Sequence, residues 1–294
     1  MLETISVGKS KMPSVGLGLW KIDQSETTAI IVDAIKSGYR HLDSAADYGN
    51  EVQVGEGIKR VLDQGICRRE DLWITSKLWN TFHRPEHVLP ACEKSLRDLG
   101  IDYLDLYLIH FPISLKYVDF DTRYPPEWIF DPTAVSPRMH IDPVPLFETW
   151  HAMERLVERG LVKEIGVCNY NSSLLHDLIA YSSIKPAMLQ IESHPFLTQE
   201  KLIKTAKNYG MAVTCFSPLG ALSYMELEMA DKNESVLNEN AVRVAAKRLN
   251  RTPAQVVLRW GLQRGTAVIP KTSQKERLIE NQSIFDFELS DQEI

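Results

Sequence analysis

Residues Leu72–His110 read LWITSKLWNTFHRPEHVLPACEKSLRDLGIDYLDLYLIH. Two short apolar segments, Leu72–Lys77 and Leu104–His110, flank an amphipathic segment, Glu86–Leu99. Short apolar runs of this kind are typical of strands that are covered on both faces, and the segment between them has the apolar spacing of a helix. The stretch therefore predicts a strand–helix–strand unit with parallel strands and a right-handed crossover.

The same alternation of short and long segments continues toward both ends of the chain. Further strands are predicted at Val15–Leu19, Tyr39–Asp43, Glu164–Asn169, Met188–Glu192, Ala212–Phe216 and Ala267–Pro270. Further helices are predicted at Thr27–Ser37, Glu51–Gln64, Phe147–Arg159, Ser173–Ser182, Gln199–Tyr209, Glu239–Leu249 and Lys275–Ile284, with one more at Pro253–Arg264. Eight strand–helix units predict an α/β fold that closes into a single (β/α)8 TIM barrel.

A doubly wound open sheet is the alternative architecture. Its G-x-G-x-x-G signature is absent after the first strand, because the stretch that begins at Gly16 ends in Lys21. No interdomain linker is visible, so we expect residues 1–294 to form one domain. An N-terminal β-hairpin is expected at Glu3–Pro13. Two long loops, Phe111–Pro145 and Leu219–Asn238, are expected at the C-terminal face of the barrel, where such loops are usually functional.

Composition excludes several classes of function. The formal net charge of −6 and the lack of a Lys/Arg cluster argue against binding to nucleic acid. No apolar stretch approaches the roughly 18 residues of a membrane span, and the N-terminus does not resemble a signal peptide. The four cysteines are scattered, which favours reduced thiols and a cytoplasmic protein.

Four ionisable residues are predicted at three adjacent strand ends. Asp43 ends the second strand and Tyr48 follows it, Lys77 ends the third strand, and His110 ends the fourth. The carboxyl ends of barrel strands face the active site, so we expect these side chains to converge there. Each residue alone also has a structural interpretation, such as a helix cap, a packing tyrosine or a surface cation.

Together the four residues suit the reduction of a carbonyl group. A nearby ammonium lowers the pKa of a phenol, so Lys77 is expected to make Tyr48 a better acid, and Asp43 keeps the ammonium charged and in place. His110 is expected to hydrogen-bond the substrate oxygen. Hydride would then reach the carbonyl carbon while Tyr48 protonates the oxygen.

Two other barrel chemistries have candidate residues. A glycosidase would use a pair of carboxylates, for which Asp43 and Glu192 are available, but Lys77 beside Asp43 would then be unexplained. His83 and His87 have the spacing of metal ligands on a helix, but Pro85 indicates a helix start there, so solvated histidines are expected instead and no metal is predicted.

A second group of polar residues surrounds the last strand. A helix that begins near Ser273 would direct its free amides toward the mouth of the barrel, and Lys271 and Arg277 supply two cations. These features suit a phosphate group. Asn169, Gln190 and Ser217 lie at the remaining strand ends, where amide side chains could hold the carboxamide of a nicotinamide ring.

Motifs along the whole chain resemble those of the aldo-keto reductases. They are LDSAADYGNE, ITSKLW, LYLIHFP, IGVCNY, QIESHP, FSPLG and IPKTSQKERLIEN, in this order. The resemblance implies the catalytic set of Asp43, Tyr48, Lys77 and His110 and an extended NADPH, with NADH as a second choice. By position it implies cofactor contacts from Asn169, Gln190, Ser217, Leu219, Lys271, Thr272, Ser273, Arg277, Glu280 and Asn281. A nicotinamide contact from Cys168 is doubtful, because the family often has Ser there.

Within the family the chain most resembles sugar-reducing members, fungal xylose reductases in particular. The resemblance implies that Trp20, Asp47, His110 and Phe111 contact the substrate and that a sugar aldehyde is reduced to its alditol. Family members usually continue beyond the point that corresponds to Ile294, so we expect a missing final helix and tail, or an unusually open pocket. Aldose-6-phosphate reduction, broad aldehyde reduction and a non-catalytic cofactor-binding subunit are the alternatives. The oligomeric state is expected to be monomer or homodimer.

Overall fold

The computed structural model describes residues 3–220, 224–231 and 234–294. Within these residues the main sheet has eight parallel strands in the order β10-β9-β8-β7-β6-β5-β4-β3. The strands are β3 (Leu17–Gly18), β4 (His41–Asp43), β5 (Trp73–Leu78), β6 (Leu104–Ile109), β7 (Val162–Cys168), β8 (Met188–Glu192), β9 (Ala212–Phe216) and β10 (Ala267–Val268). Each strand pairs with its neighbour in the chain, which is the topology of a (β/α)8 barrel.

The barrel closes between its first and last strands. Val15 forms a parallel bridge with Val268, and the Gly18 nitrogen donates to the Pro270 oxygen at 3.2 Å. A Cβ atom on Gly18 would lie 2.7 Å from the Ile269 oxygen, so this seam requires glycine. Gly16 and Gly18 therefore belong to the barrel wall. Strands β3 and β10 are shorter than the strands predicted from the sequence.

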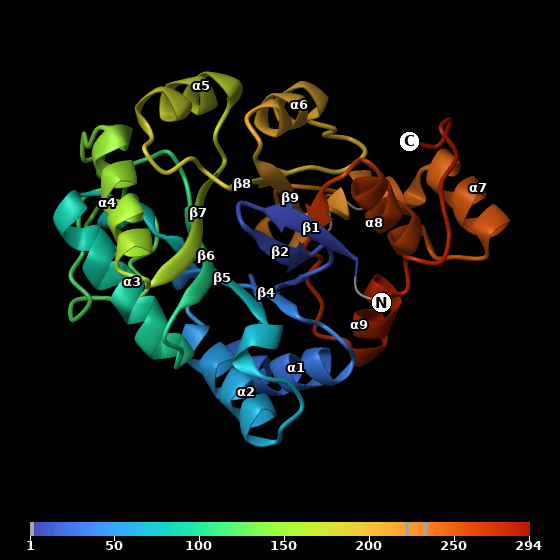
Figure 1. Ribbon diagram of the computed structural model, residues 1–294, viewed down its shortest axis with the longest axis horizontal. Coiled ribbons are helices and arrows are strands. Elements are labelled where there is room, and N and C mark those ends of the chain that lie inside the picture. The colour runs from blue at the N-terminus through green and yellow to red at the C-terminus, as the bar shows by residue number, and fades with distance from the viewer. Residues whose placement is uncertain (1–2, 221–223, 232–233) are drawn as a thin grey trace.

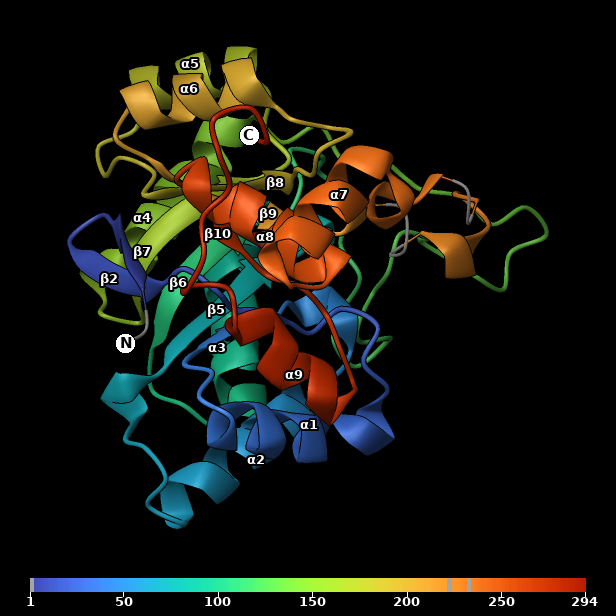
Figure 2. The same ribbon diagram turned by 90° about the vertical axis from the view of Figure 1, so that its right-hand side faces the viewer.

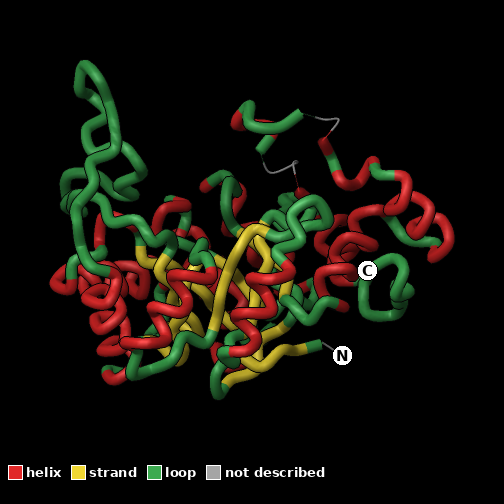
Figure 3. Tube along the Cα trace, turned by 90° about the horizontal axis from the view of Figure 1, so that it is seen from above, coloured by secondary structure: helices red, strands yellow, loops and turns green. Residues whose placement is uncertain are grey.

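Nine helices within the described residues surround the strands, as the red and yellow tubes of Figure 3 show. They are α1 (Gln24–Lys36), α2 (Glu51–Asp63), α3 (Pro85–Leu99), α4 (Leu146–Glu158), α5 (Ser172–Tyr181), α6 (Glu200–Asn208), α7 (Asn240–Leu249), α8 (Pro253–Gln263) and α9 (Lys275–Gln282). All nine predicted helices are confirmed, with ends that differ by a few residues. No described helix is both long enough and apolar enough to cross a membrane.

The N-terminal hairpin closes one end of the barrel. Strands β1 (Thr4–Val7) and β2 (Ser10–Pro13) pair antiparallel, as predicted, and lie across the barrel end that faces the viewer in Figure 1. Val7 and Met12 pack against Trp73 and Met188 inside the barrel. Because this apolar plug fills the amino ends of the strands, a ligand site is left at the carboxyl ends.

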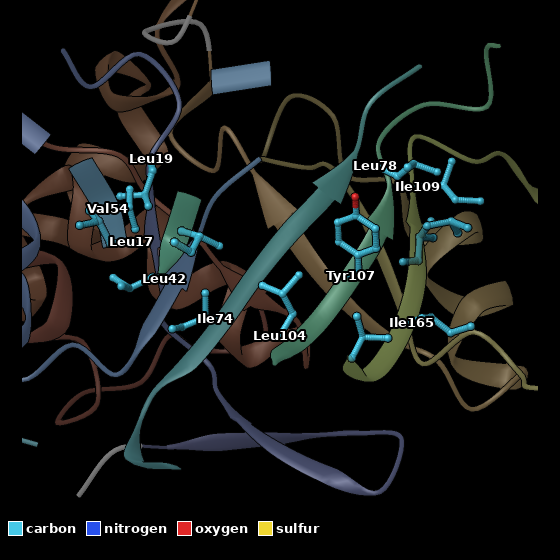
Figure 4. Packing of buried hydrophobic residues seen from close by; sticks show 14 of the residues in the cluster. Leu17, Leu19, Leu42, Val54, Ile74, Leu78, Leu104, Tyr107, Ile109 and Ile165 are labelled. Carbon is cyan, nitrogen blue, oxygen red and sulfur yellow. The ribbon is translucent and has the colours of Figure 1, made fainter. Parts of the chain in front are cut away.

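A larger apolar layer separates the strands from the helices. Figure 4 shows Ile74, Tyr107 and Ile165 of three neighbouring strands, which belong to this layer. Side chains alternate along a strand, so a residue next to an outward one points into the barrel. This alternation directs Lys77 inward while its neighbour Ser76 faces the helices.

The longest loop follows β6 and projects from the end of the barrel opposite the hairpin, in green in Figure 2. Leu115 and Ile141 form an antiparallel bridge at its base. The aromatic rings of Tyr124 and Trp128 in this loop, which we call the lid, pack against the core. Residues 221–223 and 232–233 of the second predicted loop, Leu219–Asn238, lie outside the described residues.

Candidate active site

Three adjacent strands bring the predicted catalytic residues together. Asp43 is the last residue of β4, Lys77 lies one residue before the end of β5, and His110 directly follows β6. Tyr48 ends the 3₁₀ helix η1 (Ala46–Tyr48), in the loop after β4. Parallel pairing aligns these strand ends. Lys77 therefore contacts Asp43, which lies 34 positions earlier in the chain, and Tyr48, which lies 29 positions earlier.

The Lys77 ammonium is the centre of the group. Its Nζ atom lies 2.5 Å from Oδ1 of Asp43, 3.0 Å from the Tyr48 hydroxyl oxygen and 2.8 Å from the Ser44 carbonyl oxygen. Both Lys77 and Asp43 are buried, so the interpretation of Lys77 as a surface cation does not hold. Burial alone lowers the pKa of Lys77, but the charge and the hydrogen bond of Asp43 act in the opposite direction, and that pKa is raised overall.

Burial changes the pKa of the Tyr48 phenol more than Lys77 does. Burial raises that pKa to about 12, although the Lys77 charge and hydrogen bond lower it. Lys77 lowers the pKa of the phenol, as expected, but desolvation of the phenolate is the larger effect and the pKa is raised overall. A neutral phenol is held 3.0 Å from a charged ammonium and carries a proton to donate.

His110 lies beside Tyr48 as a neutral ring. Burial, with a smaller contribution from Lys77, holds its pKa well below its usual range. The ring centroids of His110 and Tyr48 are 5.9 Å apart, and Nδ1 of His110 has no hydrogen-bond partner among the described residues. The Asn169 side-chain nitrogen donates to the His110 carbonyl oxygen at 2.9 Å. A neutral imidazole can donate one hydrogen bond to a substrate oxygen.

The predicted nicotinamide-binding residues line the same mouth. Gln190 donates from Nε2 to Oδ2 of Asp43 at 2.7 Å, so part of its amide holds the carboxylate. Asn169 and Ser217 both have left-handed backbones where the chain leaves β7 and β9. Leu219 is half-buried near Ser217. Phe216, which the sequence did not single out, is a half-buried aromatic ring at the end of β9.

The residues predicted to bind a phosphate gather at the start of α9. Lys271, Ser273 and Arg277 are exposed, whereas Thr272 is buried. The ion pairs found among the described residues include neither Lys271 nor Arg277. Two such cations and a hydroxyl at a helix start fit a phosphate monoester, such as the one that distinguishes NADPH from NADH.

The two residues predicted to contact adenine differ in accessibility. Glu280 accepts a hydrogen bond from the Thr252 hydroxyl at 2.5 Å. Asn281 is 4% exposed and is therefore buried in the protein. The start of α9 therefore presents the residues predicted to bind phosphate to solvent, while Asn281 lies in the protein interior.

An acid and several aromatic rings border the predicted substrate side. Trp20 and Asp47 are half-buried, and Oδ1 of Asp47 has no hydrogen-bond partner among the described residues. Burial, with a contribution from the Glu127 charge, raises the pKa of Asp47 to about 8. Phe111 stacks on His110 with ring centroids 4.9 Å apart. An apolar wall with one unpartnered carboxyl suits a hydroxylated ligand.

Three further aromatic residues, which the sequence did not assign to the site, complete its walls. Trp79 lies edge-on to His110, with ring centroids 5.2 Å apart, and edge-on to Trp128, with ring centroids 4.9 Å apart. Its Nε1 atom donates a hydrogen bond to the Glu127 carbonyl oxygen. Tyr224, in the second long loop, lies beside Trp20 with ring centroids 6.4 Å apart. Trp79 could have been assigned to the site from the sequence. It lies two residues after Lys77, and side chains two apart on a strand share a face.

The residues of the competing chemistries are engaged elsewhere. Glu192 accepts a hydrogen bond from the Tyr224 hydroxyl, and Asp43 is bound by Lys77 and Gln190. His83 is fully buried rather than solvated as predicted, and burial lowers its pKa to about 4. His87 instead stacks on Tyr117 with centroids 3.8 Å apart, so the two histidines do not form a pair.

Comparisons with known proteins agree with this geometry. Residues 5–294 match the aldo/keto reductase family. A probable NAD(P)H-dependent D-xylose reductase of Arthroderma otae is 48% identical over 285 residues, which are 96% of this chain and 86% of that protein. An NAD(P)H-dependent D-xylose reductase of Pyricularia oryzae is 46% identical over 285 residues, which are 96% of this chain and 87% of that protein. The structure of the aldose reductase from Schistosoma japonicum superimposes with a TM-score of 0.89 at 40% identity, covering 99% of this chain and 90% of that one.

Proposed function

The chain belongs to the aldo/keto reductase family, and from this premise we propose that it reduces the aldehyde of an open-chain aldose to an alcohol with NADPH. The observation that carries the proposal is the position of the Lys77 Nζ atom between Asp43 and the Tyr48 hydroxyl. This arrangement supplies a positioned acid at the mouth of the barrel, which is the requirement for protonating a carbonyl oxygen as it is reduced.

NADPH supplies the hydride when it is bound. The chain's own residues then perform the other half of the reaction. His110 orients the carbonyl oxygen by a hydrogen bond, and Tyr48 donates its hydroxyl proton to that oxygen as negative charge develops on it. Lys77 stabilises the phenolate that remains, since an adjacent ammonium favours the charged form of a phenol. The apolar ring of Trp79 and the lid exclude water, which strengthens these interactions.

NADPH is proposed as the preferred cofactor because of Lys271 and Arg277. Their cations have no ion-pair partner in the described part of the chain, and they lie beside Ser273 at the start of α9. NADH is the proposed second choice, since it lacks the phosphate that these residues would bind.

A sugar aldehyde is proposed as the substrate for two reasons. The curated relatives above are named as D-xylose reductases. In addition, the unpartnered Asp47 carboxyl lies on the same short segment as Tyr48, where it could accept hydrogen bonds from sugar hydroxyls. D-Xylose or a closely related pentose would meet aromatic rings and one polar group at this place.

The proposal is tested with the purified chain, NADPH and three aldehydes: D-xylose, an aldose 6-phosphate and benzaldehyde. We expect loss of NADPH absorbance with D-xylose, formation of the alditol, and a higher kcat/KM for D-xylose than for the sugar phosphate. A preference for benzaldehyde together with negligible xylose turnover would contradict the sugar assignment. Tight NADPH binding without turnover of any aldehyde would indicate a regulatory subunit instead.

We also propose that residues 1–294 act as one domain, in the cytoplasm, as a monomer or homodimer. The four cysteines are buried and free, which suits a reducing compartment. Sedimentation of the purified chain distinguishes the two assembly states.

A further inference from the structure

Glu51 is a buried acid three residues after Tyr48. It is the first residue of α2 and is 3% exposed. Its Oε1 atom accepts a hydrogen bond from the Ser76 hydroxyl at 2.6 Å, and its Oε2 atom accepts one from the Ser95 hydroxyl at 2.9 Å. Both serines are fully buried. One carboxyl therefore connects the loop of Tyr48 to strand β5 and to helix α3.

Among the residues that the structure describes, Glu51 has no ion-pair partner. Lys94, the nearby cation on α3, is paired with Asp98 at 2.6 Å. The other groups around Glu51 are the Cys92 thiol and the hydroxyls of tyrosines on β6 and the lid, which carry no positive charge. Burial raises the pKa of Glu51 to about 7, with the two serine hydrogen bonds acting in the opposite direction. Burying a carboxyl in this way is costly, so its presence calls for a reason beyond packing.

Other contacts already hold helix α2 in position. A Cβ atom on Gly55 would lie 2.6 Å from the Asp98 carbonyl oxygen, and one on Gly57 would lie 2.6 Å from Cβ of Ile31. The backbone of α2 is thus in close contact with both α3 and α1. The hydrogen bonds of Glu51 act instead on the end of the helix that adjoins Tyr48.

The two hydrogen bonds of Glu51 have different consequences. Ser76 precedes Lys77 in β5, so the bond from Ser76 joins the end of the Tyr48 loop to the strand that carries the ammonium. Ser95 belongs to the outer helix α3, so its hydrogen bond to Glu51 does not join the Tyr48 loop to the strand of Lys77. On the opposite side of the loop, Asn50 donates from Nδ2 to the carbonyl oxygens of Leu19 and Ile22 at 3.0 and 3.2 Å.

We propose that Glu51 is a positioning residue for the proton donor: through Ser76 it sets the position of the Tyr48 hydroxyl relative to Nζ of Lys77. The inference rests on the proposed function, because it concerns the same proton transfer. Glu51 does not touch the reacting atoms. It acts by adding a side-chain link between the Tyr48 loop and β5, beside the backbone bond from Ser44 to Thr75, and so holds the 3.0 Å contact between Tyr48 and Lys77.

The matched pair Ser76→Ala and Ser95→Ala tests the proposal. Each substitution removes one buried hydroxyl from the same carboxyl, so both should lower the Tm to a similar extent. The rate of hydride transfer is measured in a single turnover, with NADPH binding used to count folded sites. We expect Ser76→Ala to slow hydride transfer by about tenfold or more and Ser95→Ala by no more than about threefold, with the Kd for NADPH unchanged in both.

Two substitutions at Glu51 itself provide a second measurement. Glu51→Gln can still bond both serines, so it should transfer hydride at least about fivefold faster than Glu51→Ala, where both bonds are lost. Equal rates in the two serine variants, or a Glu51→Ala rate equal to that of the original chain, would overturn the proposal. If the unsubstituted chain reduced no aldehyde, the proposed function would fail first and this inference with it.

Discussion

Nε2 of Gln190 lies 2.7 Å from Oδ2 of Asp43, the carboxylate oxygen that Lys77 does not occupy. The two residues are 147 positions apart in the chain and meet across the inside of the barrel. The two oxygens of Asp43 are therefore held by different donors, one charged and one neutral. This contact orients the carboxylate that in turn orients Lys77, so Gln190 supports the acid as well as the predicted nicotinamide site.

Removal of the charge on Asp43 should destabilise the fold. In Asp43→Asn the Lys77 ammonium remains buried without a counter-ion, which typically costs about 3–5 kcal/mol in the free energy of unfolding. The check is urea denaturation together with steady-state turnover, which we expect to be lost. Asp105→Asn is the matched control: that buried acid pairs with Arg69 and Lys163. It should lose similar stability yet retain turnover at sites that remain folded, and equal loss of both in the two variants would contradict a specific role for Asp43.

Removal of the Tyr48 hydroxyl should abolish proton donation. We expect Tyr48→Phe to lower kcat by about 10²–10⁴-fold, the usual contribution of a general acid, while the Kd for NADPH changes little. Fluorescence titration and turnover with D-xylose provide the measurements. Tyr107→Phe is the control, since that buried phenol faces the layer between strands and helices. Persistence of the original rate in Tyr48→Phe would mean that another group supplies the proton.

The cations at the start of α9 should determine the choice of cofactor. A charge-assisted hydrogen bond to phosphate is worth about 1.5–3 kcal/mol, so Lys271→Ala and Arg277→Ala should each weaken NADPH binding by roughly tenfold or more. NADH binding should change little. Lys275→Ala is a suitable control, because Lys275 lies on the same helix and pairs with Asp33 at 3.3 Å. If all three variants bind NADPH equally well, the phosphate lies elsewhere.

The raised pKa of Asp47 predicts a dependence of stability on pH. Its folded pKa of about 8 is above the unfolded value, so the folded chain binds the proton more tightly. The associated stability is complete at low pH and is lost as the pH rises from about 4 through about 8. Asp47→Asn should therefore increase the free energy of unfolding at pH 8 by more than about 1 kcal/mol and have little effect at pH 4.

A second substitution, Asp47→Ala, should raise the KM for D-xylose, because the side chain would have no oxygen left to accept hydrogen bonds from sugar hydroxyls. Denaturation curves at the two pH values and initial rates provide the data. Asp63→Asn is the control for stability, as this exposed carboxylate pairs with Lys59 on the surface of α2. A gain in stability that is the same at both pH values would exclude titration of Asp47 as its cause.

Local sequence patterns were sufficient to predict the barrel and the residues of its candidate catalytic group. Apolar runs and helical periodicity are local properties, so strands such as Leu104–Ile109 could be recognised without knowledge of their neighbours. Parallel strands place their carboxyl ends at one face, which was enough to bring Asp43, Lys77 and His110 together. The N-terminal hairpin could likewise be predicted from the short polar segment Glu3–Pro13.

The charge and the hydrogen bonding of those residues could not be predicted, because they depend on contacts between distant segments. The pKa of Tyr48 depends on whether desolvation or Lys77 has the larger effect, and both depend on atoms that distant segments place around the ring. The burial of His83, the hydrogen bond between Gln190 and Asp43, and the connection from Glu51 to Ser76 arise in the same way. Local patterns record which residues point inward, but burial and hydrogen bonding are set by packing between segments far apart in the chain.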